Sequence, residues 1–316
     1  MTISNGTFYE TANGTNGTNS VNGHTPNLQE IHDLFIELAE KAGETIMRAH
    51  PLVNGVGSKK NSADLVTETD QAVENMISAA LMAKYPHYEF LGEETYKPGM
   101  KLTDAPTFVI DPIDGTINFV HSFPNSCVSL GFCIDRRPVV GVVFNPFTKI
   151  LYSAISGKGA FMNQKIKLPL KGENIEPLNG LSSALVGVEW GSDRSGQNWQ
   201  TKIRTVEQLG KSRELGGAMV HSMRSMGSAA LDFCAVAAGT LDIFWECGIW
   251  AWDVCAGWVI LTEAGGIVAE CTPGKWEAQV DGRKYVAVRA SPGGEGQKEM
   301  VEELWANLQG EFTYPN

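Results

Sequence analysis

Long apolar runs are missing from this chain. No stretch of about 18 consecutive apolar residues occurs, and the sequence shows no secretory leader pattern, so neither a membrane-spanning helix nor export is expected. Positive charge is also scarce, because 25 Lys and Arg residues stand against 36 Asp and Glu residues, for a net charge of −11, and the basic residues do not cluster. These absences argue against broad nucleic-acid binding and predict a cytoplasmic protein that does not bind membranes.

Cysteine pairs spaced for metal binding are missing as well. The chain has no C-x-x-C pair, and its cysteines, most of them inside apolar runs, are Cys127, Cys133, Cys234, Cys247, Cys255 and Cys271. This placement predicts small buried hydrophobic side chains rather than zinc ligands or disulfides. An apolar fraction of 43% with 19% charged residues is typical of a globular protein.

The chain divides into a polar tail and one large domain. Residues 1–27 are rich in Asn, Gly, Thr and Ser and carry few large apolar groups. Burial there cannot offset the entropy lost on ordering, so we expect disorder. The domain covers residues 28–316, with lobes of about 28–180 and 181–316.

Hydrophobic periodicity within the domain predicts both helices and strands. The predicted helices cover 28–50, 70–85, 199–208, 227–238, 252–264 and 297–309, and the predicted strands cover 107–110, 127–134, 139–144, 150–154, 184–189, 241–244 and 267–269. The strands between 127 and 154 are expected to form an antiparallel meander. The pattern alone supports a mixed α/β (α+β) fold in which helices alternate with sheet layers.

The most informative segment is Asp-Pro-Ile-Asp-Gly-Thr at 111–116, directly after the predicted buried strand 107–110. A Pro/Gly bend at the strand end can aim the carboxylates of Asp111 and Asp114 inward and can free the carbonyl of Ile113. Oxygen ligands of this kind suit Mg²⁺. Taken alone, the same residues also fit an ordinary Asx turn.

Three more acidic residues stand at the ends of predicted elements. Asp70 closes the run 64–70 at a helix start, Glu93 follows a strand end, and Asp253 opens an apolar helix. Each of them singly fits a helix cap or an acidic loop, and both are commoner than metal ligation. In an acidic chain without clustered basic residues, bound cations could supply the positive charge that an anionic phosphate needs.

Taken together, these motifs resemble the inositol monophosphatase family. The matching residues, in family order, are 64–70, Gly92-Glu93-Glu94, 111–116 with 118–121 and 123–124, Trp252-Asp253 with 256–257, and 263–266. The resemblance covers roughly residues 28–295 and implies a layered αβαβα sugar-phosphatase fold. Fungal quinate-cluster proteins belong to the same family, so a quinate-cluster protein is one form that this resemblance includes.

The resemblance implies a Mg²⁺-dependent phosphate monoester hydrolase that acts on inositol 1-phosphate and uses two or three ions. By motif match the metal ligands are Glu93, Asp111, the Ile113 carbonyl, Asp114 and Asp253. The implied catalytic residues are Asp70, Thr116 and Glu93, with Asp70 and Thr116 orienting the attacking water. A homodimer and sensitivity to lithium are implied on the same ground.

Substrate contacts follow from the same match. The implied set comprises Glu93, Ile113, Asp114, Gly115, Thr116, Gly227, Ser228, Ala229, Glu246 and Asp253. Glu246 matches the family position that accepts hydrogen bonds from polyol hydroxyls. The amides of 115–116 and 227–229 could hold ligand oxygens if each segment begins a helix, although packing through small residues explains 227–229 equally well.

Two residues depart from the family pattern next to the expected pocket. Ile117 stands at a usually polar position, and Trp250 is bulkier than the residues common at its position. Two alternatives therefore stay open: a bisphosphatase for nucleotide or fructose substrates, and a non-catalytic regulator that binds a quinate-pathway metabolite. The pair Asn118-Phe119 favours a monophosphatase over a bisphosphate nucleotidase.

Overall fold

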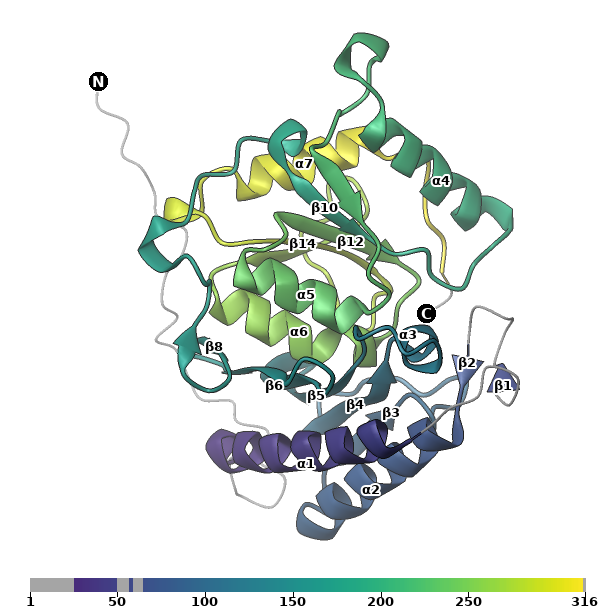
Figure 1. Cartoon of the computed structure of the whole chain (residues 1–316), viewed down its shortest axis with the longest axis vertical. Helices are drawn as coiled ribbons and strands as arrows, with labels where there is room; N and C mark the ends of the chain where they lie inside the picture. Colours follow the sequence, from purple (N-terminus) through teal and green to yellow (C-terminus); the bar gives the residue numbers. More distant parts are fainter. Residues whose placement is uncertain (1–25, 50–56, 59–64, 315–316) are drawn as a thin grey trace.

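The computed structural model describes residues 26–49, 57–58 and 65–314. Its layers follow one another in the order helices, sheet, helices, sheet, helices (Figure 1). The helical layers contain α1 (Leu28–Arg48) and α2 (Glu68–Lys84), then α5 (Ala229–Ala238) and α6 (Ala251–Glu263), then α4 (Gly196–Gly210) and α7 (Gln297–Asn307). The expected αβαβα architecture is confirmed.

Helix α1 covers the outer face of the first sheet with one buried stripe. Its buried residues recur at helical spacing and are Ile31, Phe35, Leu38, Ala39, Ala42, Gly43 and Ile46. The side chain of Asn27 accepts a hydrogen bond from the amide of Glu30 and caps the helix. The disorder predicted for 1–27 therefore does not extend to Asn27, and residues 1–25 lie outside the described part of the chain.

Helix α2 begins at Glu68, two residues before the predicted start at Asp70. Thr67 is the N-cap, and the Asp70 carboxylate accepts a hydrogen bond from the Thr67 amide at 2.9 Å, which completes a capping box. Asp70 thus lies within the first helical turn and is buried.

The first sheet has seven strands in the order β3-β4-β5-β6-β7-β8-β9. Its strands are β3 (Glu89–Gly92), β4 (Thr107–Asp114), β5 (Cys127–Ile134), β6 (Arg137–Asn145), β7 (Ile150–Ile155), β8 (Ala160–Met162) and β9 (Ile166–Lys167). Only the β3–β4 pair is parallel, so the predicted antiparallel meander is confirmed. The predicted bend after Ile110 is wrong in one respect: β4 continues to Asp114, and a bulge between Asp111 and Asp114 replaces the bend.

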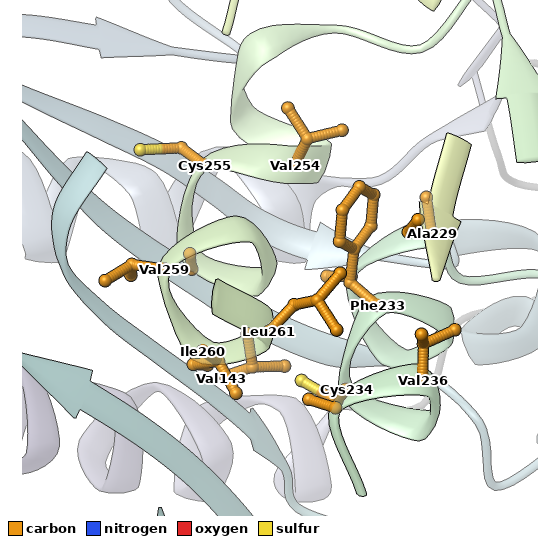
Figure 2. Close-up of a cluster of buried hydrophobic side chains, with 14 of the residues drawn as sticks. Val143, Ala229, Phe233, Cys234, Val236, Val254, Cys255, Val259, Ile260 and Leu261 are labelled. Carbon is orange, nitrogen blue, oxygen red and sulfur yellow. The ribbon is translucent and has the colours of Figure 1, made fainter. Parts of the chain in front are cut away.

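Helices α5 and α6 fill the space between the two sheets. Figure 2 shows part of this core, with Phe233 of α5 near Val254 and Leu261 of α6. Helix α6 comes very close to the first sheet at two glycines that oppose each other, Gly131 of β5 and Gly141 of β6. A Cβ atom on Gly141 would lie 2.4 Å from a backbone carbonyl oxygen of α6. These glycines therefore set the height of α6 above the sheet.

The second sheet has five strands in the order β11-β10-β12-β14-β13. They are β10 (Leu185–Val188), β11 (Ser222–Arg224), β12 (Ile243–Cys247), β13 (Ile267–Glu270) and β14 (Lys284–Val288), while β1 (Gly57–Ser58) and β2 (Leu65–Val66) form a separate pair. Strand β10 pairs in parallel with β11 and β12, whereas β14 is antiparallel to both neighbours. The periodicity did not predict β11 or β14. Strand β11 has only three residues, whereas β14 has five, as many as β12, and its apolar sequence Tyr285-Val286-Ala287-Val288 was a strand signal that the prediction missed.

All six cysteines are buried and free, as predicted, and the sulfur atoms of Cys133 and Cys255 lie 3.4 Å apart. Among the described residues, no helix combines the length and the apolar character needed to cross a membrane.

Candidate active site

Three aspartates from distant parts of the chain meet at one end of the first sheet. Asp111 and Asp114 lie in the bulged end of β4, and Asp253 lies in the first turn of α6. One carboxylate oxygen of each lies within 4.8 Å of the other two. Glu93, in the turn after β3, belongs to the same site because its negative charge raises the pKa of both Asp111 and Asp253. Its amide donates to the Ile110 carbonyl at 3.2 Å, which ties this turn to β4.

The pKa of each of the three aspartates is raised above its usual value. For Asp111 and Asp253 burial is the largest cause, and the neighbouring carboxylates add to it. Burial also raises the pKa of Asp114, to about 6, although hydrogen bonds from Ser228 and Ala230 oppose the shift. Ionised carboxylates packed this closely are unfavourable without a cation. A set of buried oxygen donors of this kind fits a hard divalent cation such as Mg²⁺.

Each aspartate is held in place through one of its oxygens. Asp114 Oδ2 accepts from the Ser228 hydroxyl at 2.6 Å and from the Ala230 amide at 2.7 Å. Asp111 Oδ1 accepts from the Ile113 amide at 3.0 Å, and Asp253 Oδ2 accepts from the Trp250 amide at 2.6 Å. These bonds fix the carboxylate planes before any ion arrives, and pre-orientation of this kind strengthens metal binding.

Asp70 and Thr116 lie side by side at the edge of this cluster. The Thr116 hydroxyl lies within hydrogen-bonding distance of Asp70 Oδ1, at 3.2 Å, and of the Ile113 carbonyl, at 3.1 Å. The single hydroxyl proton can serve only one of these acceptors at a time, so when it points to Asp70 the Ile113 carbonyl keeps its lone pairs for other contacts. The pKa of Asp70 is raised, chiefly by burial, and hydrogen bonds from Thr67 and Thr116 act against this shift.

The starts of α5 and α3 (Thr116–Val120) face each other across a tight contact. Gly115 has φ +87, and a Cβ atom there would lie 2.8 Å from the Gly227 carbonyl oxygen, so glycine is required on both counts. The Asn118 side-chain amide donates to the carbonyls of Met226 and Asn125, both at 2.7 Å, and joins the two helix starts. This contact places residues 227–229 next to the aspartates. Their role as substrate contacts stays a prediction.

Comparison with known proteins identifies the family. The model of the inositol monophosphatase family matches residues 27–309 of this sequence. The chain belongs to this family. It is 44% identical over 294 residues to Inositol monophosphatase 2 of Saccharomyces cerevisiae, covering 91% of this chain and 98% of the relative. It is 35% identical over 329 residues to Quinic acid degradation cluster protein x of Neurospora crassa, covering 91% and 96% of the two chains.

Solved structures agree with the sequence comparison. The structure of inositol monophosphatase from Anabaena matches with a TM-score of 0.69 at 28% identity, covering 89% of this chain and 96% of that one. The family assignment makes the chain a metal-dependent phosphatase, as the resemblance of its acidic motifs implied. In the structure, the carboxylate cluster at the end of β4 is the feature that agrees with this family membership.

In this inositol monophosphatase family member, Glu246 lies buried next to the last residue of β12. Burial raises its pKa to about 8, although the positive charge of Lys202 acts in the opposite direction. The Lys202 ammonium lies 3.7 Å from Glu246 Oε1 and donates to the Glu189 carbonyl at 2.7 Å. Burial thus favours the protonated form of Glu246, whereas the Lys202 ammonium favours the ionised form.

Sequence reasoning missed Glu189, which organises the loop before α5. Its Oε1 accepts from the amides of Met226 and Gly227, at 2.5 and 2.9 Å, and its Oε2 accepts from the Ser225 hydroxyl at 2.9 Å. The available signal was a carboxylate directly after a buried strand, the same signal that identified Glu93. The Gly227 amide is thus held by the protein itself, and through this loop Glu189 supports the Ser228 contact to Asp114.

Asp232, on α5, is fully buried, and neither of its carboxylate oxygens makes a hydrogen bond within the described part of the chain. Burial, followed by the negative charge of Glu189, raises its pKa well above the usual value. Below the unfolded-state pKa of about 4, Asp232 is protonated in both states and does not lower the free energy of unfolding. As pH rises from there toward the raised folded-state pKa, the unfolded chain ionises more readily, so the free energy of unfolding declines.

We therefore expect Asp232→Asn to raise the free energy of unfolding of this protein, by an amount that grows as pH rises. At pH 5 the gain should be small, whereas at pH 8 it should reach about 1–2 kcal/mol, because the amide carries no charge to bury. Urea unfolding at both pH values, with Asp104→Asn as an exposed control, measures the difference. A gain that is equal at the two pH values would contradict the assignment of a buried, protonated Asp232.

Proposed function

We propose that this chain hydrolyses inositol 1-phosphate, or a closely similar monoester of a small polyol, with the help of Mg²⁺. The convergence of Asp111 and Asp114, both buried, with the half-buried Asp253 in one cluster, and with Glu93 beside it, carries this proposal. The name of the Saccharomyces cerevisiae relative, at 44% identity, supports inositol phosphate as the substrate.

The four carboxylates would hold Mg²⁺, with the Ile113 carbonyl as a further oxygen donor. The family resemblance supports two or three ions. Bound Mg²⁺ supplies the positive charge that a doubly charged phosphate monoester requires and lowers the pKa of a neighbouring water. The net charge of −11 and the absence of clustered basic residues in the sequence agree with a site that relies on cations for this purpose.

Residues of the chain itself would orient the attacking water and the substrate. The Thr116 hydroxyl, when it donates to Asp70, presents its oxygen lone pairs outward, where it can accept a proton from water. As Thr116 takes that proton, its own hydroxyl proton would pass to the Asp70 carboxylate 3.2 Å away, so that Thr116 stays neutral. Glu246, buried 3.7 Å from the Lys202 ammonium, would hold a polyol hydroxyl on the opposite side.

The deciding experiment is phosphate release from a panel of phosphomonoesters with and without Mg²⁺. We expect turnover of inositol 1-phosphate only when Mg²⁺ is present. Its kcat/KM should exceed the values for fructose 1,6-bisphosphate and a nucleoside 3′,5′-bisphosphate by about tenfold or more, because a polyol site lacks groups for a second phosphate. Absence of phosphate release from every member of the panel would refute the proposal.

A second candidate is binding of a quinate-pathway metabolite without hydrolysis. The Neurospora crassa relative, named for quinic acid degradation, favours it at 35% identity. Calorimetry with quinate and shikimate separates the two, since tight binding by a protein that hydrolyses no phosphomonoester fits only this candidate. The family resemblance further supports a homodimer and inhibition by lithium.

A further inference from the structure

The chain that follows α7 returns across the second sheet to the edge of the candidate site. Phe312 is buried against Trp245 of β12, with ring centroids 6.1 Å apart. The backbone of Thr313 exchanges two hydrogen bonds with the Asn198 side chain, at 2.8 and 2.9 Å. These contacts anchor the segment at two neighbouring residues and place Tyr314 beside Cys247, the last residue of β12.

Tyr314 braces the backbone directly after Glu246. Its hydroxyl donates to the Cys247 carbonyl at 2.9 Å. Gly248, with φ +109, packs directly against the Tyr314 side chain, since a Cβ atom there would lie 2.8 Å from the Tyr314 hydroxyl oxygen. Burial raises the pKa of Tyr314, so the hydroxyl keeps the proton that this bond requires.

Arg283 holds the next part of the same connection, which leads toward Asp253. Its guanidinium donates to the carbonyls of Gly248, at 2.5 Å, and Ile249, at 3.0 Å. The guanidinium carbon lies 3.5 Å from the centroid of the Trp250 ring and 5.2 Å from that of Tyr314, so the cation stands between two aromatic rings. Trp250 in turn donates its amide to Asp253.

We propose that Tyr314 and Arg283 are positioning residues for the polyol side of the site: they hold the connection 247–252 and through it the placement of Glu246. The inference rests on the proposed function. Every backbone carbonyl from Cys247 to Ile249 accepts a hydrogen bond from one of these two side chains. The 247–252 connection joins the polyol-side carboxylate to the metal-side carboxylate, so its position decides how far apart the two ends of a substrate are held.

The test compares three variants of the full chain. Tyr314→Ala removes the ring and the hydroxyl, Tyr314→Phe removes only the hydroxyl, and Thr313→Ala is the matched control because its side chain is exposed and its anchoring bonds are made by the backbone. Tyr314→Ala should raise KM for inositol 1-phosphate by about tenfold while kcat changes by less than about twofold. Tyr314→Phe should raise KM by about threefold, since the ring still stacks near Arg283.

Two further measurements separate positioning from loss of fold and from failure of the proposed function. Inhibition by inorganic phosphate should be unchanged in Tyr314→Ala, because free phosphate does not reach the polyol side. Hydrogen exchange should be faster in Tyr314→Ala across 247–252, where the Gly248 amide donates to the Arg283 carbonyl at 2.7 Å, and unchanged in Thr313→Ala. An unchanged KM in Tyr314→Ala overturns the proposal, and so does unchanged exchange. If the wild-type protein hydrolyses no phosphomonoester, the proposed function fails, and the exchange result still decides whether the brace exists.

Discussion

Replacing Asp111 by asparagine should abolish nearly all phosphomonoester hydrolysis and, at the same time, make the metal-free protein more stable. Asp111 is buried, and burial followed by the negative charges of Glu93, Asp114 and Asp253 raises its pKa. The amide removes one of the repelling charges, and its carbonyl oxygen can still accept the hydrogen bond from Ile113. We expect turnover to fall by about a thousandfold. The free energy of unfolding without Mg²⁺ should rise by about 1–2 kcal/mol at neutral pH.

Phosphate release at saturating Mg²⁺ and urea unfolding in a chelator measure the two effects. Asp104→Asn is the matched control because Asp104 is exposed in the loop before the same strand, and neither quantity should change. A loss of turnover together with a gain in stability is expected for a site in which repelling carboxylates are held together to bind a cation. A variant that keeps a substantial share of its turnover, or one that is less stable without metal, would contradict the assignment of Asp111 to the metal site.

The second large effect is expected at Gly141, which carries no functional side chain itself and packs against α6 one turn after Asp253. A Cβ atom there would lie 2.4 Å from the Ala256 carbonyl oxygen and 2.6 Å from a methyl group of Val259, so Gly141→Ala must lift α6 from the sheet. Overpacking of this kind costs about 1–3 kcal/mol of unfolding free energy. Because α6 carries Asp253 in its first turn, the shift should also weaken Mg²⁺ binding by about tenfold.

Thermal unfolding and a Mg²⁺ titration of activity check this result, with Gly210→Ala as the control. Gly210 ends α4 in an exposed position, where a Cβ atom would meet only the flexible end of Met223 at 3.2 Å. The control should be neutral or slightly stabilised, since alanine favours a helix. If Gly141→Ala matched the control in both measurements, the close approach of α6 would not determine the position of Asp253.

The parts of the site that the sequence predicted share one property. Asp111, Asp114 and Glu93 follow buried apolar strands, and Asp253 opens an apolar helix, so local periodicity placed each of them at the end of an element. The sequence resemblance then joined them, and the structure brings Asp111, Asp114 and Asp253 within 4.8 Å. Local pattern failed where the backbone departed from a regular element, as in the bulge that carries β4 through to Asp114. A bulge depends on the partner strand, and the partner is not visible in a short window of sequence.

The missed residues depend on contacts between distant segments. Glu189 matters because its carboxylate accepts hydrogen bonds from two backbone amides of a loop that begins 36 residues later. Lys202 matters because its ammonium group lies beside both Glu189 and Glu246. Tyr314 resembles any aromatic residue in a polar segment until its hydroxyl is seen against the Cys247 carbonyl. None of these roles follows from spacing, since each is fixed by packing between elements that are far apart in sequence.

The amino-acid sequence by itself indicated the mixed α/β class and the buried cysteines, because periodicity and residue type are local properties. Its motifs, through their resemblance to the family, added the layered αβαβα architecture and the acidic residues of the candidate metal centre. The tertiary structure alone decided how those acidic residues face one another, which oxygen of each is anchored, and which residues brace the polyol side. The physical reason is that hydrogen bonds and close packing between distant segments act over a few ångströms, and only the folded chain brings those segments within that range.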